Sequence, residues 1–323
     1  MNSAICTIFE SHYYNGVVAL YNSLYLQGFR GELFSGFRGE LPPCFSAAKK
    51  NDSMSWPGAR SWIVSEGLTL HFLPIDTDNH LANYKPDFML ALWGGPAKEA
   101  KKMFYFDPDI ILTVEWSFID NWTDFGISLC EDVNSPLSEF HPRRMAWRKY
   151  FKEKGICLQF KGPIYANSGF IGLRSDNRDF LVKWKEIQET IAPLIGGLNR
   201  SPFTGKEQLD PADGHDYAPF SRTDQDALNA TVEYWEGTVS MVGKAGMAFG
   251  PGTTLMPHAI GSPKPWHWKP VLQAISGFPP RQADREYWKF VKGPLHIHST
   301  GLVYRRKMAL KIAGLIGRFY RRS

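Results

Sequence analysis

Apolar runs and amphipathic segments alternate along most of the chain. Short apolar runs bounded by turn residues predict strands, and apolar residues three and four positions apart predict helices. The expected strands are residues 4–9, 68–75, 102–106, 127–130 and 165–173, with a further strand inside 30–43. The expected helices are residues 17–27, 87–93, 145–154, 179–191 and 224–234. This order favours one α/β sheet with helices on both faces, followed by an irregular, Pro/Gly-rich part at 243–300.

The run Lys102–Leu112 combines a strand pattern with two carboxylates. It is rich in aromatic and β-branched residues, but Asp107 and Asp109 interrupt it on either side of Pro108. Buried carboxylates are costly unless something pairs with them, so we expect the strand to end at Phe106 and to present both Asp side chains beyond its end. Oxygen ligands of this kind suit Mg²⁺ or Mn²⁺. The alternative is a solvated Asp-Pro-Asp turn between two strands.

Length and composition indicate a globular protein. The 323 residues suffice for one large domain or two ordinary ones, and 43% hydrophobic with 21% charged residues argues against a disordered chain. Four scattered cysteines without metal-ligand or redox spacing favour free thiols in a reducing compartment. The N-terminus resembles a first strand rather than a signal peptide, and no apolar run approaches the roughly 20 residues of a membrane span. We therefore expect a cytoplasmic location.

The formal net charge of +5 is a small excess, and we expect no nucleic acid partner. The excess is concentrated near the C-terminus in a segment without acids: Arg305, Arg306, Lys307, Lys311, Arg318, Arg321 and Arg322. On a helical wheel, the apolar residues of this segment share one face: Met308, Ile312, Leu315, Ile316 and Phe319. Such helices suit anionic membrane surfaces, so we expect a main domain at 1–300 and a basic tail at 301–323 that attaches peripherally through 305–322. The alternative is a helix docked on the domain with solvated charges.

Four separated stretches together resemble glycosyltransferase family 8, which includes glycogenin and bacterial lipopolysaccharide galactosyl- and glucosyltransferases. They are the loop and helix at 9–24, Tyr105-Phe-Asp-Pro-Asp109, the pair Asn167-Ser-Gly-Phe170 and Asp224-Gln-Asp-Ala-Leu-Asn229, and His258-Ala-Ile-Gly-Ser-Pro-Lys-Pro-Trp266. The last is close to the family's His-x-x-Gly-x-x-Lys-Pro-Trp signature. The order matches, and the resemblance extends from residue 1 to about residue 270. It implies a GT-A fold, with a central mixed, mostly parallel sheet flanked by helices, that binds a nucleotide sugar.

The resemblance implies a split site for the diphosphate of a UDP-sugar. Asp107, Asp109 and His258 would hold a divalent cation, and the histidine nitrogen favours Mn²⁺ over Mg²⁺. Gly261 would let the backbone approach a phosphate, and Lys264 would supply a positive charge to it. The alternative for the His258 motif is a Pro-rich loop that packs Trp266 into the core.

Residues at the carboxyl end of the first expected strand would bind the nucleotide part of the donor. Phe9, Glu10 and Tyr13 lie where the family binds uracil and ribose. Tyr13 would stack on the base, or alternatively pack on the sheet as an ordinary aromatic residue. The pattern offers only Lys85 where many members of the family have an arginine that contacts the phosphate or ribose, and its register is unclear.

The sugar itself would meet four further residues. Asn167 and Gly169 resemble the family's sugar-contacting Asn-x-Gly, or alternatively form a tight turn. Asp224 would bond sugar hydroxyls and Gln225 would lie near the anomeric carbon, although Asp224 also suits a helix N-cap. Gln225 is a poor nucleophile, so retention would proceed by attack on the leaving-group face rather than through a glycosyl ester. The segment 193–222, with Phe203, Tyr217 and Phe220, is the candidate acceptor loop.

The expected activity is therefore retaining transfer of glucose or galactose from a UDP-sugar to a glycan acceptor, with Mn²⁺ (or Mg²⁺). The acceptor would be lipopolysaccharide or another surface polysaccharide at the cytoplasmic face of the inner membrane. Two alternatives remain: a sugar-nucleotidyltransferase, and a non-catalytic protein that binds sugar nucleotides.

Overall fold

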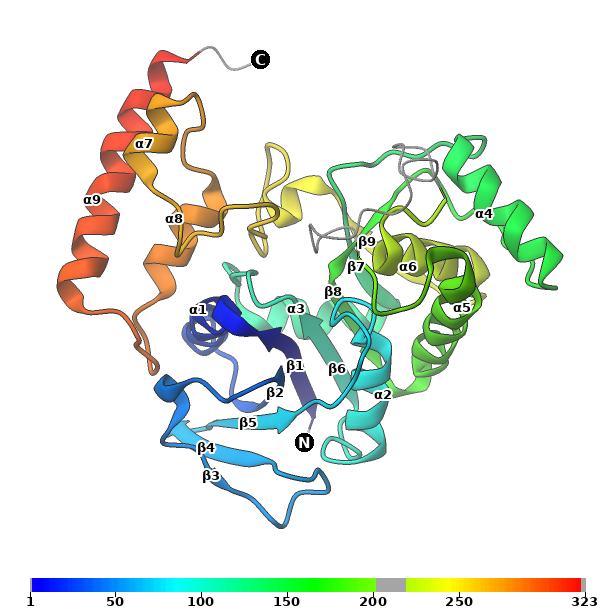
Figure 1. The fold of residues 1–323 in the computed structure, drawn as a ribbon, viewed down its shortest axis with the longest axis horizontal. Helices are drawn as coiled ribbons and strands as arrows, with labels where there is room; N and C mark the ends of the chain where they lie inside the picture. Colours follow the sequence, from blue (N-terminus) through cyan, green and yellow to red (C-terminus); the bar gives the residue numbers. More distant parts are fainter. Residues whose placement is uncertain (1, 202–218, 321–323) are drawn as a thin grey trace.

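A single mixed sheet organises the chain, for which a computed structural model describes residues 2–201 and 219–320. Its strands are β1 Ser3–Glu10, β2 Gly31–Arg38, β3 Lys49–Lys50, β4 Arg60–Ser65, β5 Leu68–Pro74, β6 Lys102–Phe106, β7 Ile127–Glu131, β8 Ala166–Arg174 and β9 Val239–Val242. Their spatial order is β3-β4-β5-β2-β1-β6-β8-β7-β9 (Figure 1). The central block β5-β2-β1-β6 is parallel, whereas β8 runs antiparallel to both β6 and β7. The α/β class and the mixed sheet expected from the sequence are confirmed, but among the described residues only four of the eight strand pairings are parallel, so the sheet is not mostly parallel as expected.

Helices cover both faces of this sheet, because successive side chains of a strand point to opposite sides. The helices are α1 Tyr14–Leu26, α2 Lys85–Gly94, α3 Trp116–Trp122, α4 Pro142–Glu153, α5 Asp179–Ile195, α6 Thr223–Tyr234, α7 Pro270–Ile275, α8 Gln282–Phe290 and α9 Thr300–Ile316. Ala4, Cys6 and Ile8 of β1 belong to a core shared with α2, α5 and α6. Ile5 and Phe9 of the same strand belong to a second core, shared with α1 and α3.

The part after residue 243 is more regular than its Pro and Gly content indicates. It contains α7 and α8, which together with α9 form an arm beside the sheet (Figure 1). We call residues 270–320 the C-terminal arm. Its core is aromatic and includes Tyr287 and Trp288, which cluster with Trp268 just before the arm. At the start of α8 the Asp284 carboxylate accepts hydrogen bonds from the backbone amide of Arg281 at 3.0 Å and from its guanidinium at 2.9 and 2.8 Å, which satisfies the N-cap amide as a capping box would.

The helix α9 packs on α7 and α8 with a face different from the apolar face on the helical wheel. Its buried residues are Val303, Leu310 and Ala313. In contrast, Ile312 is 47% exposed and Phe319 is 90% exposed. The helix is therefore docked on α7 and α8, which was the alternative to a free membrane-binding tail. It also keeps an apolar strip open to solvent. Within residues 2–201 and 219–320, no helix is long and apolar enough to cross a bilayer.

Candidate functional site

The Asp-Pro-Asp turn lies at the carboxyl end of β6, in the middle of the sheet. The amide of Asp107 donates a 2.7 Å hydrogen bond to the carbonyl of Gly169 on the neighbouring β8. Asp109 is only 5% exposed. The turn is therefore not the solvated acidic turn that was the alternative interpretation, and its second carboxylate needs partners.

His258 reaches the turn because its segment pairs with the residues that follow Asp109. Ile110 and His258 form an isolated antiparallel bridge. The amide of Ala259 donates to the carbonyl of Asp109 at 3.1 Å, and the amide of Ile111 donates to the carbonyl of Pro257 at 3.1 Å. This backbone pairing fixes the imidazole opposite the two carboxylates.

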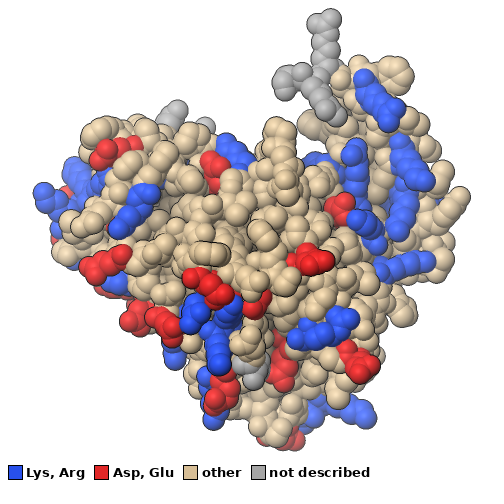
Figure 2. Space-filling model, turned by 180° about the vertical axis from the view of Figure 1, so that it is seen from behind, with Lys and Arg blue, Asp and Glu red and all other residues tan. Residues whose placement is uncertain are grey.

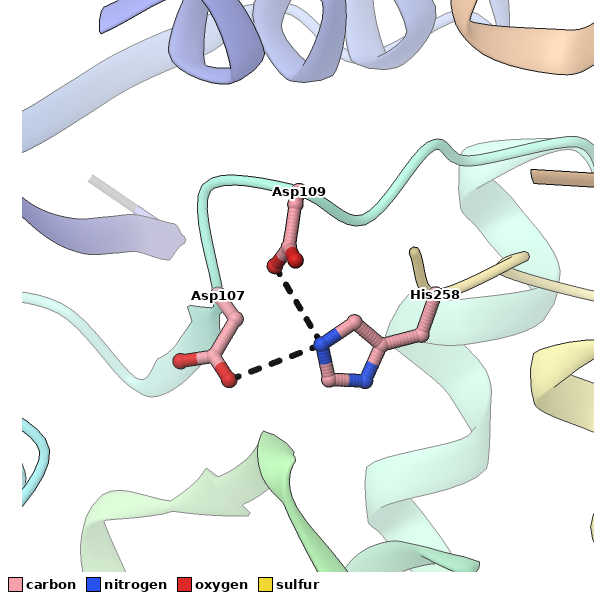
Figure 3. A group of neighbouring side chains, drawn as sticks. All are labelled: Asp107, Asp109 and His258. Carbon is pink, nitrogen blue, oxygen red and sulfur yellow. Dashed lines mark ion pairs between the residues drawn. The ribbon is translucent and has the colours of Figure 1, made fainter. Parts of the chain in front are cut away.

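Figure 3 shows the resulting cluster, in which the two Asp side chains and the imidazole point toward one another. The His258 Nε2 atom lies 3.2 Å from Asp109 Oδ1 and 3.7 Å from Asp107 Oδ2. One ligand atom from each residue lies within 4.8 Å of the other two. Two carboxylates and one imidazole are a donor set that suits a divalent cation. The structure thus brings together the three residues that the sequence assigned to the metal.

Two glycines make this convergence possible. A Cβ atom at Gly169 would lie 2.6 Å from Cε1 of His258 and 2.9 Å from Oδ2 of Asp107. A Cβ atom at Gly16, in the first helix, would lie 2.2 Å from the carbonyl oxygen of Pro108. Real Cβ contacts are longer than these, so only glycine fits at either position. Gly169 therefore packs against Asp107 and His258 of this three-residue cluster.

Lys264 sits beside the cluster and neutralises Asp109. Its ammonium group contacts Oδ2 of Asp109 and donates to the carbonyl of Ala259 at 2.8 Å. Burial would raise the pKa of the Asp109 carboxyl, but the charges of Lys264 and His258 outweigh it and hold that pKa well below its usual range. Asp109 is therefore ionised, the form in which a carboxylate binds a metal.

Lys85 lies between Asp107 of the candidate metal site and Asp224, one of the residues expected to meet the sugar. It is 3% exposed, and its Nζ lies 3.2 Å from Asp107 Oδ1 and 3.1 Å from Asp224 Oδ2. Burial would lower the pKa of Lys85, but Asp107 and Asp224 outweigh it and raise the pKa overall. The sequence left open whether Lys85 faces the site. The structure shows that it does, because α2 begins at Lys85 and directs this side chain between Asp107 and Asp224.

Asn167, Asp224 and Gln225 form one hydrogen-bonded group next to Lys85. The side-chain amide of Asn167 donates to Gln225 Oε1 at 3.3 Å, and Ser168 Oγ donates to Asp224 Oδ2 at 2.6 Å. The other carboxylate oxygen of Asp224, Oδ1, is buried and has no hydrogen-bond partner among the described residues. A buried oxygen without a donor is costly, so this atom is a natural acceptor for a ligand hydroxyl. Asp224 lies in the first turn of α6, and its side chain makes no cap hydrogen bond to the helix.

The residues expected at the nucleotide have mixed surroundings. The Phe9 side chain is 2% exposed and packs between Phe37 and Phe45, so its contact with a ligand would have to come from the backbone. Glu10 lies at the end of β1 and accepts a 2.9 Å hydrogen bond from Arg38 Nε. Arg38 also donates to the carbonyl of Asn79 at 3.0 Å. Because both contacts fix the guanidinium, Arg38 holds the carboxylate of Glu10 at the sheet edge.

Tyr13 and the end of the histidine motif form an aromatic group. The Tyr13 ring stacks on His12 at 4.8 Å between centroids and meets the edge of Trp266 at 5.8 Å. The indole of Trp266 donates to His12 Nδ1 at 2.9 Å. Tyr13 therefore packs on its neighbours and is half-buried, and the Lys264 ammonium lies over its ring at 5.6 Å from the centroid. Trp266 is buried, as expected if the Pro-rich loop packs it into the core. It nevertheless lies near Pro108, between the two aspartates of the candidate metal site.

Two residues of this region were not among the sequence candidates. Asp132 is 3% exposed, and its Oδ2 accepts a 2.7 Å hydrogen bond from Asn167. The acidic pair after strand 127–130 was the sequence signal for it. Arg38 was also missed, and nothing in its local sequence points to Glu10 because their contact depends on the pairing of β1 with β2.

Two further candidates lie outside this group. Gly261 has φ 73°, and a Cβ there would meet no atom within 4 Å, so glycine is required by backbone conformation rather than by space. In the expected acceptor loop, Phe203 and Tyr217 lie outside the described residues. Phe220 is fully buried against Trp147 and Phe151 and is therefore a core residue.

Neither a protein-family model nor a curated protein matches the sequence. Among solved structures, the galactosyltransferase LgtC in complex with donor and acceptor sugar analogues matches at a TM-score of 0.51 and 14% identity, over 94% of this chain and 99% of that chain. A glutamine-to-glutamate active-site mutant of LgtC matches at a TM-score of 0.50, with 14% identity and the same shares of both chains. At this identity, the likeness is one of fold. The chain has the GT-A fold of LgtC, a glycosyltransferase of family 8.

Proposed function

We propose that this protein is a metal-dependent retaining glycosyltransferase that transfers glucose or galactose from a UDP-sugar to a glycan acceptor. The convergence of Asp107, Asp109 and His258 at the end of a central strand carries the proposal. The fold supports it, because LgtC has that fold and was crystallised with donor and acceptor sugar analogues. Ligands of open α/β sheets bind at this edge.

The residues around the cluster suit a diphosphate leaving group. A divalent cation, which we propose is Mn²⁺, would neutralise the diphosphate as its bond to the sugar breaks. Lys264 adds a positive charge beside Asp109. The positive φ of Gly261 turns the backbone of the loop between His258 and Lys264. Glu10, braced by Arg38, and Tyr13 would bind the uridine.

Asn167, Asp224 and Gln225 would hold the hexose. Asp224 Oδ1 is the acceptor without a partner, and we assign it to a sugar hydroxyl. The second oxygen of Asp224 is already bound by Lys85 and Ser168, so this carboxylate is fixed as an orienting group. Gln225 is no nucleophile, and retention would therefore follow from attack on the leaving-group face, with the departing phosphate oxygen taking the acceptor proton. A glycosyl ester trapped on Asp224 and detected by mass spectrometry would contradict this route.

The acceptor is proposed to be a surface glycan, such as lipopolysaccharide, at the cytoplasmic face of the inner membrane. The apolar strip and basic residues of α9 support peripheral attachment there. The rival sugar-nucleotidyltransferase would need a Gly-rich, basic phosphate loop after the first strand, but residues 9–16 contain one glycine and no lysine or arginine. A non-catalytic relative would not need to keep both Asp109 and His258.

The decisive experiment is a panel of nucleotide sugars with Mn²⁺, scored by UDP release and by binding calorimetry. The wild type should respond to at least one UDP-sugar. Asp109→Asn should lower kcat/KM by at least about 100-fold, because a metal contributes several kcal/mol of charge stabilisation. Asp176→Asn is the matched control and should behave as wild type, because Asp176 is exposed and follows the end of β8 that is remote from Asn167 and Gly169. Failure of every UDP-sugar to bind would overturn the proposal.

A further inference from the structure

A cationic groove runs between α8 and α9 in the C-terminal arm. Its volume is about 1490 Å³. Five basic side chains line it, and no acidic side chain does: Arg285, Lys289, Lys307, Lys311 and Arg318. Figure 2 shows Lys and Arg side chains gathered along this arm.

The charges of the groove are almost unneutralised. Among the described residues, only Lys289 has an ion-pair partner, Glu286 at 3.2 Å. Like charges that face one another repel, and a concave surface concentrates their field. The groove is therefore built to attract an anion rather than to hold the arm together.

The floor of the groove is kept open by small residues. A Cβ at Gly277 would meet no atom within 4 Å, and one at Gly314 would come no closer than 3.6 Å to any atom, the nearest being on the Arg285 guanidinium. At one end, Tyr320 donates a 2.8 Å hydrogen bond to the carbonyl of Ile275 and links the end of α9 to α7. The groove thus has two helical walls and an open floor.

An exposed apolar strip borders the groove. Ile312 and Leu315 of α9 are 47% and 54% exposed, and Phe319, in the 3₁₀ turn Gly317–Phe319 that follows the helix, is 90% exposed. Leu315 belongs to both features, because it also lines the groove. A soluble anion would use the cations alone and leave the strip in water. A bilayer uses both, since its phosphates meet the cations while apolar side chains enter the acyl boundary.

We propose that this groove binds the phosphate groups of anionic phospholipids while the apolar strip of α9 inserts beside them. This inference rests on the peripheral attachment in the proposed function. It differs from attachment through a basic tail alone, because the proposed membrane-binding surface is built from both α8 and α9.

Cosedimentation with vesicles tests the contribution of α8. The full-length protein should bind vesicles of phosphatidylcholine with phosphatidylglycerol and not vesicles of phosphatidylcholine alone. Arg285→Ala/Lys289→Ala should weaken binding to the anionic vesicles about tenfold, although both residues precede the tail. Lys149→Ala/Lys152→Ala, two exposed basic residues of α4, is the matched control and should bind as wild type.

Three outcomes would overturn the inference. They are wild-type binding by the α8 double variant, equal binding to neutral vesicles, and release from anionic vesicles by millimolar inorganic phosphate at constant ionic strength. If the α8 variant does not fold, as judged by circular dichroism, Lys307→Ala/Lys311→Ala on the opposite wall takes its place with the same expected loss. Binding of a UDP-sugar with Mn²⁺ is measured on each variant and should be unchanged. A wild type that binds anionic vesicles but no UDP-sugar would contradict the proposed transferase and leave the groove proposal intact.

Discussion

The lysines of the site and the lysines of the C-terminal arm have opposite surroundings. Lys85 is 3% exposed and contacts two carboxylates, Asp107 and Asp224. Lys264 is largely buried and contacts Asp109. In contrast, Lys307 and Lys311 of α9 are exposed and have no ion-pair partner among the described residues.

This difference separates charges that organise the protein from charges that are available to a partner. Ions lose hydration on burial, so a buried lysine is tolerated only with carboxylates around it, and removal of either partner leaves a costly charge. An exposed lysine keeps its hydration and adds little to stability. The site is therefore preorganised by its own ion pairs, whereas the arm leaves its charge for an external anion.

The largest expected effect is on stability when Lys85 is removed. Lys85→Met would leave Asp107 and Asp224 facing each other without a cation, and should lower the free energy of unfolding by about 3–5 kcal/mol at pH 7. Urea unfolding followed by circular dichroism measures the change. Lys85→Arg, which keeps the charge, should lose less. A loss below about 1 kcal/mol in Lys85→Met would show that the ion pairs do not organise the site.

The next prediction concerns Asp226, a fully buried carboxylate near the site, with Arg143 Nη1 at 3.7 Å from its Oδ1. It accepts a 2.6 Å hydrogen bond from Tyr165, and burial raises the pKa of its carboxyl to about 6. Between the unfolded pKa of about 4 and this value, the folded state binds more protons than the unfolded state. The stability contribution of Asp226 is therefore greatest at low pH and falls as pH rises through about 6.

Asp226→Asn removes this titration. Across the interval from pH 4.5 to 7.5, the free energy of unfolding of the wild type should decline relative to that of the variant by about 2 kcal/mol. Urea unfolding of both proteins at the two pH values gives the comparison. Parallel pH profiles would mean that Asp226 is ionised throughout, like the lysine-paired Asp109.

A smaller loss is expected when Gly16 gains a methyl group. Gly16→Ala would press on the carbonyl oxygen of Pro108 and should cost about 1–3 kcal/mol, despite the better helix propensity of alanine. It should also weaken Mn²⁺ binding measured by calorimetry, because Asp107 and Asp109 flank Pro108. Gly94→Ala is the control, since a Cβ there meets no atom within 4 Å. Equal stability of the two variants would refute the close-packing role of Gly16.

The smallest effect is expected in the arm. Lys311→Met removes an exposed cation without a partner and should change the free energy of unfolding by less than about 0.5 kcal/mol. Measured beside Lys85→Met under the same conditions, it completes the comparison of the two lysine environments. A loss as large as that of Lys85→Met would assign the arm cations to stability instead of binding.

Much of the sheet was predictable because its central strands are buried on both faces. The run 102–106 matches β6, and the expected strands at 4–9 and 127–130 match β1 and β7 to within one residue at each end. The strands β3, β4 and β9 were missed. β4 has no fully buried residue and β9 has only half-buried ones, so neither shows the apolar pattern of a central strand. Edge strands are fixed by pairing with a neighbour, which sequence periodicity does not reveal.

The candidate site was predictable where chemistry and order along the chain both pointed to it. The acidic pair Asp107 and Asp109 and the histidine motif at His258 were found because they follow one another along the chain in the order of the family's motifs. Lys85 had the right position but an uncertain register, which depended on where α2 begins. The contact between Arg38 and Glu10 depends on strand register, and the contact between Gly16 and Pro108 depends on helix packing. Such contacts leave no local trace in the sequence.

The isolated bridge between Ile110 and His258 has a consequence for biosynthesis. Asp107 and Asp109 emerge from the ribosome early, but the histidine that completes their cluster belongs to a segment made much later. Domains generally fold as units during synthesis. The Asp-Pro-Asp turn is therefore made while the nascent chain still lacks the histidine of the candidate metal site. Binding of a divalent cation by all three side chains would consequently be a late event, available only after translation has passed His258.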